Sequence, residues 1–393
     1  PRHAGLRAQY PVAPPAGRRR PEIPQGTTPT NRRFLVGAAV PPCAGRPLRS
    51  PCDNPAMGQH DRFEELAASV GGFYRSWVIY LGLELGLFEA IRAGGRTGVT
   101  ADELAAATGS QAEPVTAWLR AAHAGDLVGL DNDRATLADD VAAVLLDDTH
   151  PEYLGGQFVV AVVSSLDYAG LVEFFRTGRT IGERPPRFHR AIESVTVQDI
   201  AVFFQEGLAE LPDLAAALTR GGRVLDVACG GGRWLIAIAR RFPDTQLVGV
   251  EFEPDSVARA MSHVTEAGLG DRIRVEARTI PDMPFRSEFD LVYLQDALHE
   301  LPDPGPSLGA AWAAVAPGGR LVVLEWCLPD DGADEQTLQA ELLWGIQLDE
   351  LYQGTRMYTH EGYEQLFRDA GVPAPTVVDL RSGASLFVVQ RPA

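Results

Sequence analysis

The residues best suited to chemistry gather around one run of small residues, Cys229-Gly230-Gly231-Gly232. The run follows an apolar, strand-like segment at 223–228 and precedes a segment with helical periodicity at 233–241. A strand, a glycine loop and a helix in this order leave backbone N–H groups free at the helix amino terminus. Glycines also let a ligand approach the backbone closely. The segment therefore predicts a site for a nucleotide-like ligand at the carboxyl end of the strand.

Two carboxylates flank this loop and narrow the choice of ligand. Asp226 stands inside the end of the first strand, and Glu251 ends the next strand, 19 residues after Gly232. A carboxylate at the second place accepts hydrogen bonds from ribose hydroxyls, whereas one at the first suits a cationic tail such as an α-amino group. A dinucleotide fingerprint would need a small residue at 235, where the chain has Leu235. The pattern favours S-adenosylmethionine over NAD.

The second half of the chain supplies the elements that must hold this loop. Strand-like and helix-like segments alternate, and two strands joined around Ser382-Gly383 close the chain. We predict an α/β fold with a doubly wound, seven-stranded, Rossmann-like sheet over residues 221–393. The predicted strands are 223–228, 246–251, 273–278, 289–294, 320–325, 376–380 and 385–390, and the predicted helices are 233–241, 254–267, 305–315, 335–351 and 360–370.

Residues 57–391 resemble class I methyltransferases, in particular the small-molecule O-methyltransferases with an N-terminal winged-helix dimerisation domain. The matching stretches are 224–232, 249–251, 298–301 and 317–325, with weaker matches at 358–363 and 370–371. The resemblance implies S-adenosylmethionine as cofactor, no metal, and a small hydroxyl acceptor that is aromatic or polyketide-like. It also implies a homodimer.

The resemblance assigns the cofactor to residues near the ends of strands. Asp226, Gly230 and Gly232 would hold its methionine part, Glu251 its ribose and Phe252 its adenine face, and Thr279 and Gln295 would lie near the adenine and the rim of the fourth strand.

The catalytic residues that the resemblance implies are His299 and Glu325. His299 would remove the proton of the acceptor hydroxyl, and Glu325 would orient its imidazole. An imidazole with a pKa near 6.5 suits this task, because a phenol has a pKa near 10. The chain departs from the family at two places: Ala277-Arg278 replaces a frequent Gly-Asp, and Met357 falls where the family has a second acid beside the histidine.

The first half of the chain predicts three further regions. Residues 1–56 are rich in Pro and Arg, and we expect a disordered extension with Met57 as the natural start. Residues 57–150 predict a helix over 61–93, a short helix opened by a capping box of Thr100 and Glu103, another helix and a hairpin, in the order of a winged helix. Residues 151–220 predict a helical linker that covers the substrate.

Composition limits the partners and the location. A chain with a net charge of −17 repels the negatively charged phosphate backbone of nucleic acids, so we expect no nucleic acid partner. We also expect no membrane partner, because no apolar run approaches the roughly 20 residues of a membrane span. The four cysteines form no CxxC pair, which is typical of a cytoplasmic protein.

Three alternatives remain open at this point. C- or N-methylation could occur on the same scaffold, and a relative could keep the cofactor for different chemistry. A ligand-sensing regulator built on the winged helix is the alternative outside enzymes; it would need a basic helix at 112–124, where Arg120 is the only arginine.

Overall fold

The structure is a computed structural model that describes residues 59–150, 152–330 and 336–393. The predicted disordered extension, residues 1–56, and the predicted start at Met57 lie outside these residues.

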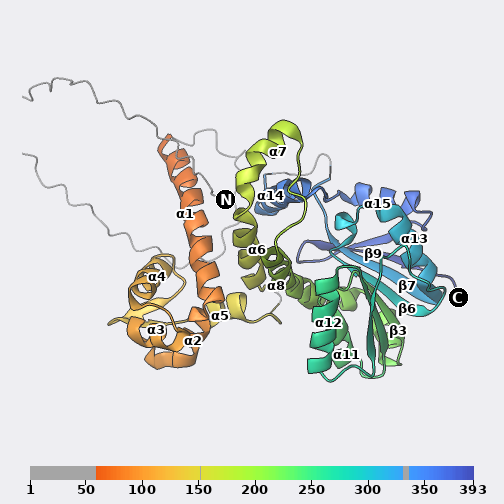
Figure 1. Cartoon of the computed structure of the whole chain (residues 1–393), viewed down its shortest axis with the longest axis horizontal. Helices are drawn as coiled ribbons and strands as arrows, with labels where there is room; N and C mark the ends of the chain where they lie inside the picture. The colour runs from red at the N-terminus through yellow and green to blue at the C-terminus, as the bar shows by residue number, and fades with distance from the viewer. Residues whose placement is uncertain (1–58, 151, 331–335) are drawn as a thin grey trace, which may run out of the picture. The chain divides into compact units, whose positions relative to one another are not determined.

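A seven-stranded sheet forms the centre of the C-terminal half (Figure 1), with the strand order β5-β4-β3-β6-β7-β9-β8. The five strands from β5 to β7 are parallel, whereas β9 is antiparallel to both β7 and β8. The strands are β3 (Arg223–Val227), β4 (Gln246–Glu251), β5 (Ile273–Ala277), β6 (Phe289–Gln295), β7 (Val315–Trp326), β8 (Thr376–Asp379) and β9 (Ala384–Gln390). The predicted doubly wound sheet is confirmed. Its order reverses between β3 and β6, which is where such sheets bind ligands.

Helices cover both faces of this sheet (Figure 1) because each strand is apolar on both sides. Leu235 and Val264 pack with Val224 on one face, and Leu308 and Phe367 pack with apolar residues of the same strands on the other. The helices of the first face are α10 (Pro212–Thr219), α11 (Arg233–Arg241) and α12 (Pro254–Glu266), and those of the second are α13 (Pro304–Ala314) and α15 (His360–Asp369).

Helices dominate residues 59–150. The predicted helix over 61–93 is two helices, α1 (Gln59–Glu84) and α2 (Leu87–Gly94), because the backbone turns left-handed at Gly86, with φ of 68°. The capping box is confirmed: Thr100 accepts the N–H of Glu103, whose carboxylate accepts the N–H of Thr100. The remaining elements are the 3-10 turn Gly95–Thr97, α3 (Ala101–Thr108), α4 (Ala112–Ala124), β1 (Gly129–Asp131), β2 (Arg134–Thr136) and α5 (Asp139–Leu146). The winged-helix assignment stays a prediction.

The chain between α5 and β3 is mostly helical, and its longest helix is α8 (Pro186–Val202). A π-helical turn, Phe203–Gly207, continues α8, and the Phe203 ring packs on Trp234 and Tyr293 at centroid distances of 5.4 and 4.8 Å. The other elements are α6 (Gly155–Ser165), the 3-10 turn Tyr168–Gly170, α7 (Leu171–Thr177), α9 (Leu208–Glu210), and later α14 (Leu338–Gln353).

No single helix among the described residues is long and apolar enough to cross a membrane. One bent pair, Gly155–Ser165 with Tyr168–Thr177, has the length and composition to do so.

Candidate active site

The glycine loop leaves β3 through an unusual backbone. Ala228, Gly230 and Gly232 have positive φ angles of 60°, 49° and 71°. Gly232 caps α11, whose first N–H groups have no partner within the helix. A Cβ placed on Gly230 would meet no atom within 4 Å, so the space beside it is open. The left-handed conformation costs a residue such as Ala228 about 1 kcal/mol, and such strain is concentrated at functional sites.

Two buried carboxylates lie beside this loop, as the sequence predicts. The Glu251 carboxylate accepts the backbone N–H groups of Gly230 at 3.0 Å, Phe252 at 2.8 Å and Glu253 at 2.9 Å. Asp226 is 3% exposed, and its carboxylate makes no hydrogen bond to the part of the chain that the structure describes. Burial and the charge of Glu251 raise the pKa of Asp226 well above its usual range. A cationic ligand group would relieve this cost, because an opposite charge favours the ionised carboxylate.

The other predicted cofactor residues divide into two groups. Phe252 follows Glu251 directly and is 69% exposed, so its ring is free to cover a ligand. Thr279 donates a hydrogen bond to Asp282 at 2.6 Å, and Gln295 donates to the Thr196 carbonyl of α8 at 3.1 Å. The structure therefore brings all of these residues to the carboxyl ends of the parallel strands, where Thr279 and Gln295 also hydrogen-bond to other protein groups.

His299 lies one strand away, in the 3-10 turn Leu298–Glu300 that follows β6. Its Nδ1 lies 2.8 Å from Oε2 of Glu325, at the carboxyl end of the adjacent strand β7. Glu325 is fully buried and also accepts the Leu298 N–H at 2.7 Å and the Tyr363 hydroxyl at 2.8 Å. An ionised carboxylate only accepts hydrogen bonds, so Nδ1 of His299 is the donor and Nε2 is the nitrogen left for chemistry.

Two further carboxylates face this imidazole. Oε2 of Glu350, on α14, lies 4.0 Å from Nε2 of His299 and is held by the Thr355 hydroxyl at 2.6 Å. Asp296 lies 3.8 Å from Nδ1, at the end of β6, with a left-handed φ of 46°. Burial lowers the pKa of His299, but the charge and hydrogen bond of Glu325, together with Asp296, outweigh it and raise the pKa well above 6.5.

The sequence was compared with protein families and with curated proteins. Residues 218–371 match the family model of a methyltransferase domain. Over 115 residues, the chain is 33% identical to the demethylmenaquinone methyltransferase of Lactiplantibacillus plantarum, which covers 29% of this chain and 48% of that protein. The chain carries a methyltransferase domain. It spans about half the length of the curated relatives it matches.

Solved structures of methyltransferases share the fold over a longer range. Human N-acetylserotonin methyltransferase in complex with SAM has a TM-score of 0.63 at 17% identity, covering 86% of this chain and 100% of that one. PigF with SAH has a TM-score of 0.66 at 21% identity, with the same coverage. The likeness therefore includes residues outside the methyltransferase domain, in the helical first half.

Sequence reasoning missed a carboxylate that α8 brings to the methyltransferase domain. Asp199 is 3% exposed, and its Oδ1 accepts the indole N–H of Trp326 at 3.0 Å. Burial, followed by the charge of Asp296, raises the pKa of Asp199 well above its usual range. Burial also raises the pKa of Asp296 to about 7. No local motif signals Asp199 or Glu350, because each reaches the site only through the packing of a distant helix.

Apolar side chains adjoin this acidic region. Leu328, Leu343 and Met357 form a small buried cluster with Trp326 against it. The position where the family has its second acid is thus apolar, and Glu350 is the carboxylate that faces Nε2 of His299.

The spacing of the carboxylates would also admit a cation. The ligand atoms of Asp296, His299 and Glu325 lie within 4.8 Å of one another, as do those of His299, Glu300 and Glu350. In the first group, a metal ion would have to replace the hydrogen bond between Nδ1 of His299 and Glu325.

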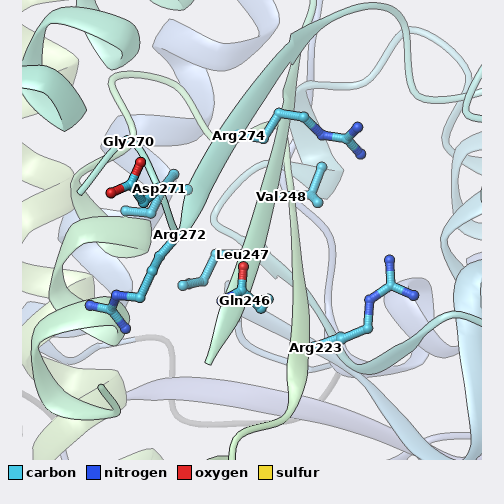
Figure 2. A pocket seen from close by; sticks show the side chains of 9 residues that line it. Arg223, Gln246, Leu247, Val248, Gly270, Asp271, Arg272 and Arg274 are labelled. Carbon is cyan, nitrogen blue, oxygen red and sulfur yellow. The ribbon is translucent and has the colours of Figure 1, made fainter. Parts of the chain in front are cut away.

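A hollow of about 380 Å³ lies at the opposite, amino-terminal ends of β3, β4 and β5, and Figure 2 shows side chains that line it. Arg272, which lines it, donates to the carbonyls of Ala239 at 2.6 Å and Pro243 at 2.5 Å. Arg274 pairs with Glu276 at 2.8 Å. These arginines serve the fold, and the hollow lies away from the glycine loop and His299.

Proposed function

We propose that the protein transfers a methyl group from S-adenosylmethionine to a hydroxyl of a small aromatic or polyketide-like acceptor, with His299 as general base. The observation that carries this proposal is the 2.8 Å contact between Nδ1 of His299 and Glu325, which leaves Nε2 free. This imidazole follows β6, and the glycine loop follows β3, the neighbouring parallel strand. Both groups therefore stand at the same edge of the sheet.

The residues beside the loop fit this cofactor. Asp226 would bind the cationic methionine part together with the backbone at Gly230 and Gly232, and Glu251 would bind the ribose hydroxyls. Phe252 would cover the adenine. The buried Asp226 carboxylate supports this assignment, because it lacks a hydrogen bond within the described chain and lies beside a second carboxylate. Thr279 and Gln295 would lie near the adenine and the rim of β6.

S-adenosylmethionine, held by Asp226, Gly230, Gly232 and Glu251, would supply a methyl group activated on a sulfonium. The acceptor oxygen would take this methyl, and the cofactor would leave as a neutral thioether that keeps the electron pair of the carbon–sulfur bond. The hydroxyl proton passes to Nε2 of His299, and Glu325 stabilises the resulting imidazolium. The remaining work of the protein is to hold oxygen and methyl in line and to exclude water.

Because the pKa of His299 is raised, its ability to act as a base depends on groups that change its protonation state. A protonated imidazole cannot accept the hydroxyl proton, so the resting site has to lose a proton before transfer. A positively charged ligand nearby lowers the pKa of an imidazole. Cofactor binding would therefore move His299 toward its basic form.

A homodimer is part of this proposal. Helix α1 exposes a stripe of large apolar side chains at helical spacing, more than half exposed in one chain: Phe63, Leu66, Val70, Phe73 and Tyr74. A patch of this kind is typical of an interface. Light scattering should give twice the chain mass, and Val70→Glu should reduce it; a monomeric wild type would contradict this part.

The test of the function uses a panel of phenols with S-adenosylmethionine, followed by mass spectrometry and NMR of the product. We expect a gain of one methyl on oxygen, and a loss of about 10²–10⁴ in kcat for His299→Ala, the usual contribution of a general base. His123→Ala, which removes a histidine that contacts the Val128 carbonyl in the helical first half, is the matched control. Full turnover by His299→Ala would refute the base. Methylation on carbon or nitrogen would contradict the hydroxyl acceptor but would still agree with methyltransferase activity.

A further inference from the structure

Negative charge exceeds positive charge around His299. Five carboxylates lie there, those of Asp199, Asp296, Glu300, Glu325 and Glu350, and three of them, Asp296, Glu325 and Glu350, are within 4.0 Å of the imidazole. Among the described residues, no arginine forms an ion pair with any of the five. His299 is neutral when it acts as the base, so a sulfonium would be the one cation of the proposed complex, and more carboxylates than cations would remain at the site.

Two buried side chains have polar atoms that no described residue satisfies. His299 is 6% exposed, and its Nε2 makes no hydrogen bond, since Glu350 is 4.0 Å away. Asp199 is 3% exposed; Trp326 satisfies its Oδ1, and Oδ2 has no hydrogen-bond partner within the described chain. Neither atom is fully enclosed by the described residues, so each is available to a polar group of a bound ligand.

The groups near Asp199 are those that recognise an ammonium. The Asp199 carboxylate, held by the indole N–H of Trp326, lies close enough to Asp296 for the charge of Asp296 to act on it, and paired carboxylates are usual partners of such cations. Asp199 comes from α8, whereas Trp326 and Asp296 come from the ends of β7 and β6. The contact therefore forms where the helical segment meets the methyltransferase domain.

We propose that the acceptor carries a protonated amine, which Asp199 and Asp296 bind while His299 receives the proton of the methylated hydroxyl. This inference rests on the proposed function and names its substrate class. Burial is the largest cause that raises the pKa of both carboxyls. It is followed by the charge of Asp296 for Asp199, and by the charges of Glu325 and Glu350 for Asp296, which supports a site that awaits a cation.

The test compares three catechols that differ in side-chain charge: dopamine, 4-ethylcatechol and 3,4-dihydroxyphenylacetate. Calorimetry first establishes that the full chain binds S-adenosylhomocysteine, and each catechol is then titrated into that complex. We expect dopamine to bind at least tenfold more tightly than 4-ethylcatechol, and the anion most weakly. Asp199→Asn should remove the advantage of dopamine and leave the affinity for 4-ethylcatechol within about threefold.

The controls separate the possible explanations. Asp271→Asn removes the same charge at the distal hollow of Figure 2 and should change none of the three affinities. Asp296→Asn provides a second variant should Asp199→Asn fail to fold. Binding of neither S-adenosylmethionine nor its product would refute the proposed function itself.

Other outcomes overturn the amine site and leave the methyltransferase intact. Equal binding of dopamine and 4-ethylcatechol, or no binding of any catechol, would do so. A preference that survives both Asp199→Asn and Asp296→Asn would also overturn it. A further contrary result is that Asp199→Asn weakens S-adenosylmethionine relative to its neutral-sulfur product without changing the catechol order, because Asp199 would then serve the cofactor.

Discussion

Replacing Glu325 by Gln is the sharpest probe of the catalytic pair. The carboxylate is fully buried and accepts three hydrogen bonds, at 2.7, 2.8 and 2.8 Å. An amide of the same shape carries no charge and accepts on one atom only, so at least one of the three bonds is lost. A hydrogen bond to a charged group contributes about 1.5–3 kcal/mol. We therefore expect a loss of about 2–3 kcal/mol in transition-state stabilisation, which is about 30- to 150-fold in kcat.

The pH profile gives the same substitution a second readout. His299 works as a base only when neutral, so wild-type kcat should rise with pH through a limb that lies above pH 6.5. Glu325 is the largest cause that raises the pKa of His299. Its removal should lower that pKa and move the limb to lower pH.

Initial rates between about pH 5.5 and 9.5, at saturating cofactor and acceptor, measure both effects. Tyr363→Phe is the matched control, since it removes one hydrogen bond to Glu325 and retains the charge. This variant should lose about 1 kcal/mol of transition-state stabilisation, and the pH limb of its kcat should stay where it is in the wild type. An unchanged kcat together with an unmoved limb for Glu325→Gln would refute the pairing.

Three further predictions follow from the local geometry. Asp226→Asn should weaken binding of S-adenosylmethionine and of its product alike by about tenfold, since both carry the amino group; unchanged calorimetric affinities would contradict the assignment. Ala228→Gly should stabilise the fold by about 0.5–1 kcal/mol in urea unfolding, because φ is 60° there; a loss of stability would show that Ala228 is not strained. Thr100→Ala should destabilise the protein by about 1 kcal/mol through the lost cap, with Thr100→Ser as control; equal unfolding midpoints for wild type and Thr100→Ala would count against the cap.

Locally encoded features were predictable from the sequence. The strand, glycine loop and helix around Gly230 depend on neighbours in the chain, and so does the box of Thr100 and Glu103, and both form where expected. His299 and Glu325 are 26 residues apart, but His299 follows β6 and Glu325 stands at the carboxyl end of the adjacent parallel strand β7, so predicting the sheet also predicts their meeting.

Features that depend on helix packing were not predictable. Asp199 and Glu350 belong to α8 and α14, and nothing in their local sequence tells which side chains those helices turn toward His299. The break between α1 and α2 was missed because the apolar period continues across Gly86, whereas the backbone turns there. Sequence reasoning thus identified the site residues at the ends of the strands, His299 and Glu325. It missed those on the packed helices, Asp199 and Glu350.

Calorimetric titration of the full chain with S-adenosylmethionine, and separately with NAD, tests the central claim most directly. The account predicts one-site binding of S-adenosylmethionine and no heat with NAD, with binding weakened by Asp226→Asn. Folded protein that binds no S-adenosylmethionine would contradict the role given to the loop from Asp226 to Gly232, and with it the proposed methyl transfer.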